Sequence, residues 1–176
     1  MSKKLKKQST ILPLLRLLES QTPIFLDRDQ GNKRMPQLLQ EAGITVQWHS
    51  QRFTDTTQDD VWIRDVAKQG WIIVSSDKGL ETDPDNRLAV IESKAKVFIL
   101  EENNARAVHW ASALIVSRDR IYEAVNDNEG PFYMNVLRKS TSLVWKFRVP
   151  SVEDSAATAS PADVSKVKTR KSNSAE

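Results

Sequence analysis

Three groups of aspartates stand where a parallel sheet would bring them to one edge. Asp27 ends the apolar run PIFL, Asp77 follows the run WIIVSS, and Asp59 and Asp60 begin a stretch with helical spacing. Sites in open parallel sheets form beyond the carboxyl ends of the strands, and a helix that follows a strand begins at that same edge. We therefore expect these carboxylates, which are far apart in the sequence, to meet near a common point.

Carboxylates in such a group favour a hard cation. Neighbouring carboxylates repel one another, so one of them takes up a proton unless a cation joins the group. Mg²⁺ and Mn²⁺ prefer oxygen ligands, and such a metal activates a water and stabilises the oxyanions of a phosphodiester under attack. Each aspartate taken alone has a structural alternative as a helix cap or turn residue. Their shared edge is what favours the metal site.

The elements that would position these acids alternate along the chain. Strands are predicted at six short apolar runs: 23–26, 44–48, 71–74, 96–100, 132–137 and 143–147. Helices are predicted at three stretches: 33–42, from Thr56 or Thr57 to Gln69, and 104–125 as one long helix. This order predicts an α/β fold, a three-layer α/β/α sandwich with a mostly parallel sheet and an edge hairpin near the C-terminus.

The composition excludes several other classes of protein. The chain has 176 residues, which suits one domain with extensions, and no cysteine, which excludes a disulfide scaffold and a thiol nucleophile. With two histidines, a His-rich zinc site is not expected. No run of about 18 apolar residues suggests a membrane span, and the N-terminal stretch does not read as a signal peptide. We therefore expect a cytoplasmic protein with no membrane partner.

Both ends of the chain differ from its middle. Residues 1–21 are predicted to be a basic N-terminal extension with a short helix, and residues 149–176 a disordered tail rich in Ser, Ala, Thr and Lys. The basic excess is in the first 20 residues, at +4, whereas residues 21–150 sum to −1. The net charge of +3 is therefore no sign of a nucleic-acid patch on the folded body. We expect both extensions to be solvated tails. The alternative is that they contact RNA or a partner, in which case the run Lys166–Lys171 would add a salt-dependent attraction for RNA.

Two runs of the sequence resemble the PIN-like (VapC-like) ribonucleases of bacterial toxin–antitoxin pairs: PIFLDRDQGNKRMPQLLQEAGITVQWHSQRF and TTQDDVWIRDVAKQGWIIVSSDKGL. The resemblance is to a compact subgroup that has a strand-ending Asp, a His-x-x-x-Phe segment, an Asp-x-x-Trp helix start and a Gly-Trp strand that leads to Asp. The corresponding residues here are Asp27, His49 with Phe53, Asp59 with Trp62, and Gly70-Trp71 through Asp77. The runs AKVFIL and GPFYMNV are similar to later strands of the subgroup, so the resemblance covers about residues 22–148, the expected PIN-like domain.

The resemblance implies a chemistry and a set of site residues. PIN domains carry three or four acids around Mg²⁺ or Mn²⁺ and cut RNA, so it implies a metal-dependent endoribonuclease, a hydrolase that acts as a toxin held by an antitoxin. Asp27, Asp59 and Asp77 are the implied catalytic residues and metal ligands. Asp60 is an alternative or additional ligand, because the sequence does not fix the rotation of its helix. Asp83 or Asp85 would supply a fourth acid, and the oligomeric state stays open, with a homodimer as one option.

Several neighbours of these acids have two interpretations. Ser75 stands where PIN domains often have a hydroxyl, and we expect it to orient the carboxylate of Asp77. Lys78 either meets the scissile phosphate or is a solvated turn lysine. His49 is expected to be a hydrogen-bonded structural histidine rather than a general base. Tryptophans are expected in the core, and of the five only Trp48 lies near the proposed edge.

Two other classes of function compete with a nuclease. A phosphoacceptor receiver domain also gathers acids around Mg²⁺, but it needs adjacent acids after the first strand, and Asp27 and Asp29 are not adjacent. A PIN-like domain that is catalytically silent and only binds RNA or protein is the other alternative. The presence of Asp27, Asp59 and Asp77 argues against it.

Overall fold

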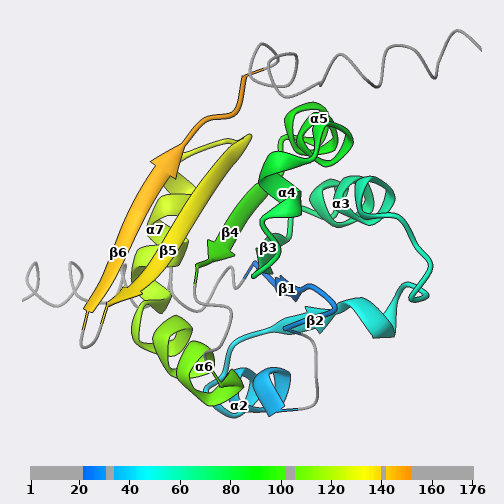
Figure 1. Cartoon of the computed structure of the whole chain (residues 1–176). Helices are drawn as coiled ribbons and strands as arrows, with labels where there is room; N and C mark the ends of the chain where they lie inside the picture. Colours follow the sequence, from blue (N-terminus) through cyan, green and yellow to red (C-terminus); the bar gives the residue numbers. More distant parts are fainter. Residues whose placement is uncertain (1–21, 31–33, 102–105, 140–141, 152–176) are drawn as a thin grey trace, which may run out of the picture.

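A six-stranded sheet forms the centre of the protein (Figure 1). The structure is a computed structural model, and it describes residues 22–30, 34–101, 106–139 and 142–151. The strand order is β2-β1-β3-β4-β5-β6. The strands are β1 (Ile24–Leu26), β2 (Val46–Trp48), β3 (Ile72–Ser75), β4 (Lys96–Leu100), β5 (Phe132–Lys139) and β6 (Ser142–Arg148). Pairing is parallel from β2 to β5 and antiparallel between β5 and β6. The predicted mostly parallel sheet with a C-terminal edge hairpin is confirmed.

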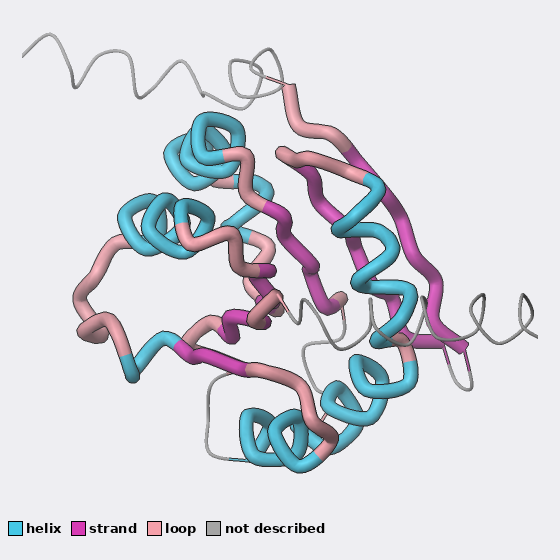
Figure 2. Tube along the Cα trace, turned by 180° about the vertical axis from the view of Figure 1, so that it is seen from behind, coloured by secondary structure: helices cyan, strands magenta, loops and turns pink. Residues whose placement is uncertain are grey.

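Helices cover both faces of the sheet, which makes three layers (Figures 1 and 2). The helices on one face are α2 (Arg34–Glu41), α6 (Ala107–Val116) and α7 (Arg118–Asp127). The helices on the other face are α3 (Asp59–Lys68), α4 (Gly79–Thr82) and α5 (Pro84–Ser93). A short 3₁₀ turn, η1 (His49–Gln51), follows β2. The predicted sandwich is therefore the observed one.

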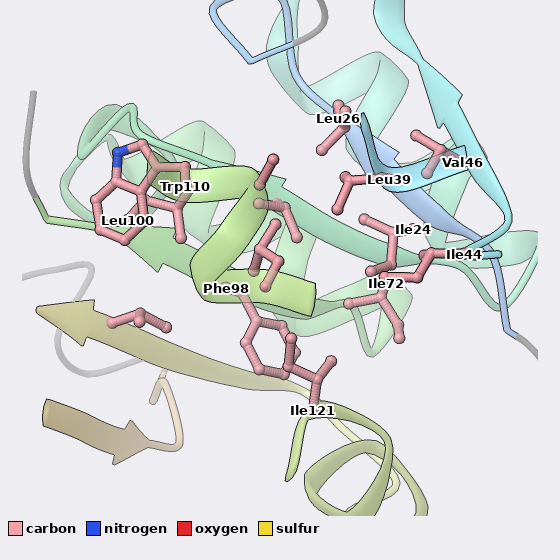
Figure 3. Close-up of a cluster of buried hydrophobic side chains, with 14 of the residues drawn as sticks. Ile24, Leu26, Leu39, Ile44, Val46, Ile72, Phe98, Leu100, Trp110 and Ile121 are labelled. Carbon is pink, nitrogen blue, oxygen red and sulfur yellow. The ribbon is translucent and has the colours of Figure 1, made fainter. Parts of the chain in front are cut away.

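The strands are short and apolar because both of their faces are buried. Ile24 and Leu26 of β1 join the core cluster on the side of α2, α6 and α7, which Figure 3 shows, whereas Phe25 joins the cluster under α3 and α5. Neighbouring residues of β3 divide in the same way, with Ile72 in the first cluster and Ile73 in the second. A strand buried on both faces reads as a continuous apolar run, which is the pattern seen in the sequence.

The connection between β3 and β4 corrects the sequence-based expectation, which placed no helix there. Two parallel neighbours need a crossover connection, and α4 and α5 supply it. Asp83 caps α5, since its side chain accepts hydrogen bonds from the amides of Asp85 and Asn86, and Pro84 fits the first turn. Few apolar residues of α5 are buried, among them Ala89 and Val90, so the helix leaves a weak periodic signal.

The single long helix predicted over 104–125 is also wrong, because it is broken at Ser117. This residue has φ −94° and ψ 8°, away from helical values, and it ends α6 and precedes α7. Its amide still donates to the carbonyl of Ala113, at 3.0 Å. Buried residues continue at helical spacing on both sides of the break, such as Leu114 and Ile121, which is why the sequence pattern conceals it.

The strand order creates a divergence between β1 and β3. The chain leaves β1 through α2, on one face, and leaves β3 through α4 and α5, on the opposite face. In open α/β sheets, the crevice outside the carboxyl ends of two such strands is the usual place for a ligand. The fold therefore points to the ends of β1 and β3 as the place to look for a site.

The proposed extensions are mostly outside the part of the chain that the structure describes. Residues 1–21 and 152–176, which include the Lys166–Lys171 run, lie outside the described residues, so the expected domain limits of 1–21, 22–148 and 149–176 stay a prediction. Within the described ranges, no helix is long and apolar enough to cross a membrane.

Candidate functional site

Asp27 lies at the end of β1 and is almost completely buried, with 6% of its surface exposed. Its amide donates to the carbonyl of Val74, at 3.1 Å, which fixes it against β3. Its carboxylate accepts two hydrogen bonds, from the Ser75 hydroxyl to Oδ2 at 2.7 Å and from the Arg28 amide to Oδ1 at 2.5 Å. The backbone and the neighbouring strand therefore hold this carboxylate in one orientation.

Ser75 connects the first and the third predicted acid. It is completely buried at the end of β3, donates to Asp27, and accepts from the backbone amide of Asp77 at 2.9 Å. The expectation that Ser75 orients the Asp77 carboxylate is thus corrected, because the hydroxyl binds the carboxylate of Asp27 and only the backbone of Asp77. Both acids are held by one hydroxyl at the ends of two adjacent strands.

The carboxylate of Asp77 is held by the start of α4. Its Oδ1 accepts from the amide of Gly79 at 2.7 Å. A Cβ on residue 79 would lie 3.0 Å from Oδ1 and 3.1 Å from Oδ2 of Asp77, so the absence of a side chain at Gly79 permits this close approach. Lys78, between the two, is exposed, which leaves both of its interpretations open.

Asp59, at the start of α3, is held by two donors. Its Oδ1 accepts from the indole Nε1 of Trp62, at 2.9 Å, and forms an ion pair with the guanidinium of Arg28. Arg28 Nη1 also donates to the carbonyl of Asp55, at 2.8 Å, so this arginine joins the segment after β1 to the segment before α3. Trp62 is otherwise buried in the core, which fixes the position of its indole.

Sequence reasoning missed the roles of Arg28 and Trp62. The sequence pattern predicts only a core position for Trp62, although Asp59 and Trp62 are three residues apart and therefore lie on one face of a helix. Arg28 gave no signal beyond its place next to Asp27. Its contact with Asp59 depends on how the segment before α3 folds back, which no periodicity records.

Asp60 faces a different partner from Asp59. Its Oδ2 pairs with Arg64 of the same helix, at 2.7 Å, and Arg64 also pairs with Glu92 of α5, at 3.2 Å. Asp59, in contrast, interacts electrostatically with Asp27. The rotation of α3, which the sequence left open, therefore directs Asp59 towards the first acid and Asp60 towards α5.

Burial gives Asp27 a perturbed acidity. Desolvation raises the pKa of Asp27 above its usual value and is the largest cause. The hydrogen bonds from Ser75 and from the Arg28 amide lower this pKa, the negative charge of Asp59 raises it, and the positive charge of Arg28 lowers it. This raised pKa has the direction expected for a carboxylate in an acidic group without a cation, although burial contributes more to it than the charge of Asp59.

An open depression of about 430 Å³ lies beside this group, between the start of α3 and the start of α5. Its lining includes Asp59 and Asp60 as well as Asp83 and Asp85, which the sequence suggested as further acids. Arg28 is the only cationic residue among the described residues that line it. Arg28, which pairs with Asp59, is therefore the positive charge in an otherwise acidic and polar lining.

His49 corrects another expectation. It is completely buried, and neither of its ring nitrogens has a hydrogen-bond partner within the described residues. Its ring packs against Phe53, with centroids 5.4 Å apart, and against Trp62, at 6.1 Å. Burial is the main cause that lowers the pKa of His49, and the charge of Arg28 lowers it further, against opposing effects of Asp59 and Asp55. His49 is a neutral packing residue behind the indole that holds Asp59.

The tryptophans follow the core expectation in part. Trp62 and Trp110 are completely or almost completely buried, whereas Trp71 and Trp145 are half-buried at the margins of the two core clusters. Trp48, the one tryptophan expected near the edge, packs against the cluster under α2.

The chemistry of the three predicted acids suits a hard cation such as Mg²⁺ or Mn²⁺. Asp27, Asp59 and Asp77 offer only carboxylate oxygens, and the first two interact as like charges. Over the described ranges, however, no group of three acidic or histidine side chains is placed to hold a metal ion. The Oδ1 atom of Asp59 is paired with Arg28.

Comparison with known proteins agrees with this fold. A family model described as "PIN like domain" matches residues 23–102, the stretch from β1 to the end of β4. Residues 23–102 are thus similar to PIN-like domains, which leaves the receiver alternative without support. A protein of Mycobacterium tuberculosis named "Putative ribonuclease VapC45" is 29% identical over 124 residues, which cover 68% of this chain and 89% of that protein. No solved structure is significantly similar.

Proposed function

We propose that this protein is a metal-dependent endoribonuclease that hydrolyses RNA phosphodiester bonds. The observation that carries the proposal is the linkage of Asp27 and Asp77, which stand at the ends of adjacent strands and share the Ser75 hydroxyl. Asp59 comes from a third segment and interacts with Asp27. The name of the M. tuberculosis relative, a ribonuclease, supports the same activity.

In this proposal, Asp27, Asp59 and Asp77 hold Mg²⁺ or Mn²⁺, with Asp60 as a neighbouring acid. A bound divalent cation supplies an activated water and stabilises the charge on the phosphodiester oxygens. Ser75 keeps the carboxylate of Asp27 oriented, and the amide of Gly79 does so for Asp77. Lys78 is exposed next to Asp77 and provides a positive charge for the RNA backbone.

We further propose that the protein acts as the toxin of a toxin–antitoxin pair, with RNA as its substrate and an antitoxin protein as its partner. This role rests on the resemblance of the sequence to PIN-like toxins. It predicts that expression of the wild-type chain slows growth, that Asp77→Asn relieves this effect, and that the product of a neighbouring gene binds the chain and blocks RNA cleavage.

A second candidate function is a domain that binds RNA or protein without cleaving. The pairing of Asp59 with Arg28 favours it, because this pairing neutralises one of the three acids without any metal. A cleavage assay separates the two candidates.

The test compares purified wild-type protein with Asp77→Asn on single-stranded and structured RNA, in Mg²⁺ or Mn²⁺ and then in EDTA. The substitution keeps the size of the side chain but removes a charge that would hold the metal, so activity should fall by about 10²-fold or more. The melting temperature should not fall, since a clustered negative charge is removed. Cleavage at full rate in EDTA, or by Asp77→Asn, would refute the mechanism.

A further inference from the structure

The guanidinium of Arg28 occupies the place on Asp59 where a cation would bind. Its Nη2 pairs with Oδ1 of Asp59, the same oxygen that accepts the indole N–H of Trp62. Its Nη1 bonds to the carbonyl of Asp55, at 2.8 Å. The side chain thereby places one positive charge on an acid that interacts with the buried Asp27.

This contact balances charge in the absence of a metal. Arg28 pairs directly with Asp59, so its positive charge offsets part of the repulsion between Asp59 and the buried Asp27. A divalent cation bound to the same carboxylates would offset more of it. Two cations on one carboxylate repel each other, so the guanidinium and the metal compete for Asp59.

The ion pair is exposed enough to be exchanged. The side chains of Arg28 and Asp59 keep 36% and 24% of their surface accessible, and pairs at such positions contribute little to stability. Arg28 also lines the open depression beside α3 and α5, so its guanidinium has space into which it can move. Trp62 does not have this freedom, because it is completely buried. The indole is therefore a fixed donor to Asp59 that does not depend on the guanidinium.

We propose that Arg28 is an exchangeable counter-ion of Asp59, which holds the carboxylate while no divalent cation is bound and gives it up when one binds. This inference rests on the proposed metal site. It makes Arg28 a positioning residue that sets the affinity for the metal, and it accounts for three acids that share an edge without a preformed metal-binding group among the described residues.

The test is the binding of Mn²⁺ to the full chain, measured by isothermal titration calorimetry without RNA. Arg28→Gln removes the competing charge, so it should bind Mn²⁺ at least about threefold tighter than the wild type. Arg28→Lys keeps a charge but lacks the planar fork, and it should lie between the two. The matched control is Arg64→Gln, which removes the same charge from Asp60 and should leave the affinity within about twofold of the wild type. Circular dichroism checks that each variant is folded, and Arg28→Lys serves as the test if Arg28→Gln is not.

The outcomes separate this inference from the proposed function. If the wild type binds Mn²⁺, Asp59→Asn weakens that binding, and Arg28→Gln binds as the wild type or more weakly, then the counter-ion inference is wrong and the metal site stands. An equal gain in Arg64→Gln also overturns the inference, because the effect would then be one of general charge. If neither the wild type nor Arg28→Gln binds Mn²⁺ at millimolar concentration, the proposed metal site itself is wrong.

Discussion

Ser75→Ala tests whether one hydroxyl joins the two acids. The substitution removes a buried hydrogen bond to the charged carboxylate of Asp27, which contributes about 1.5–3 kcal/mol, and a bond from the amide of Asp77, which contributes about 0.5–1.5 kcal/mol. Both groups are left inside or at the edge of the core without this partner, so we expect a loss of about 3 kcal/mol in the free energy of unfolding. For a domain of this size, such a loss lowers the melting temperature by about 10 °C.

The adjacent serine provides the control. Ser76 accepts one hydrogen bond from Gln30 Nε2, at 2.7 Å, in a half-buried position, so Ser76→Ala should cost about 1 kcal/mol. The assay is urea unfolding of both variants at pH 7 in EDTA. Asp27→Asn completes a double-mutant cycle with Ser75→Ala. In the Asp27→Asn background, Ser75→Ala should lower the free energy of unfolding by less, because the charge-assisted part of the hydrogen bond is already gone. A cost for Ser75→Ala no larger than that for Ser76→Ala, or an unchanged cost in the Asp27→Asn background, would refute the reasoning.

Three further predictions concern stability. The pKa of His49 is lowered in the fold, so the unfolded chain takes up a proton more readily. The wild type should therefore lose stability as the pH falls below about 6.5. In urea unfolding between pH 7.5 and 5.5, His49→Leu should remove that pH dependence. The pKa of Asp27 is raised in the fold, so ionisation of this carboxyl lowers the free energy of unfolding at pH 7. Asp27→Asn should therefore raise the melting temperature at pH 7 in EDTA. The gain should vanish below about pH 3.8, where the carboxyl is protonated in both the folded and the unfolded state. Glu81 joins α4 to β6 through Arg148, at 2.5 Å, and to β5 through Asn135, at 3.0 Å. Glu81→Ala should therefore lower the free energy of unfolding by about 1–3 kcal/mol in thermal unfolding. An unchanged stability would show that these bonds do not hold α4 in place.

The positions of the strand-ending acids were predictable because burial dictates them. A strand buried on both faces must be apolar throughout, so the first polar residue after it, such as Asp27, marks the edge of the sheet. The same reasoning located Asp77 two residues past β3 and placed Asp59 and Asp60 at the start of a helix. These inferences need only the periodicity of a chain segment and the rule that parallel strands end at one edge.

Features that depend on contacts between distant segments were not predictable from periodicity. The Ser75 hydroxyl binds Asp27, which directly follows another strand, and the guanidinium of Arg28 binds Asp59 on α3, 31 residues away. α5 was missed because its burial rests on few apolar residues, and its start is fixed by the cap at Asp83 rather than by a hydrophobic stripe. His49 was expected to be hydrogen-bonded, but the aromatic rings of Phe53 and Trp62 surround it instead.

The location of Mn²⁺ in crystals of this protein tests the central proposal most directly. Anomalous scattering from crystals grown with Mn²⁺ should place the ion at the carboxyl ends of β1 and β3, with oxygens of Asp27, Asp59 and Asp77 as direct or water-bridged ligands at about 2.1–2.2 Å for direct contacts. In the same crystals the guanidinium of Arg28 should no longer contact Asp59. Manganese that binds elsewhere, or a peak at this edge without Asp27 and Asp77 among its ligands, would contradict the proposed site.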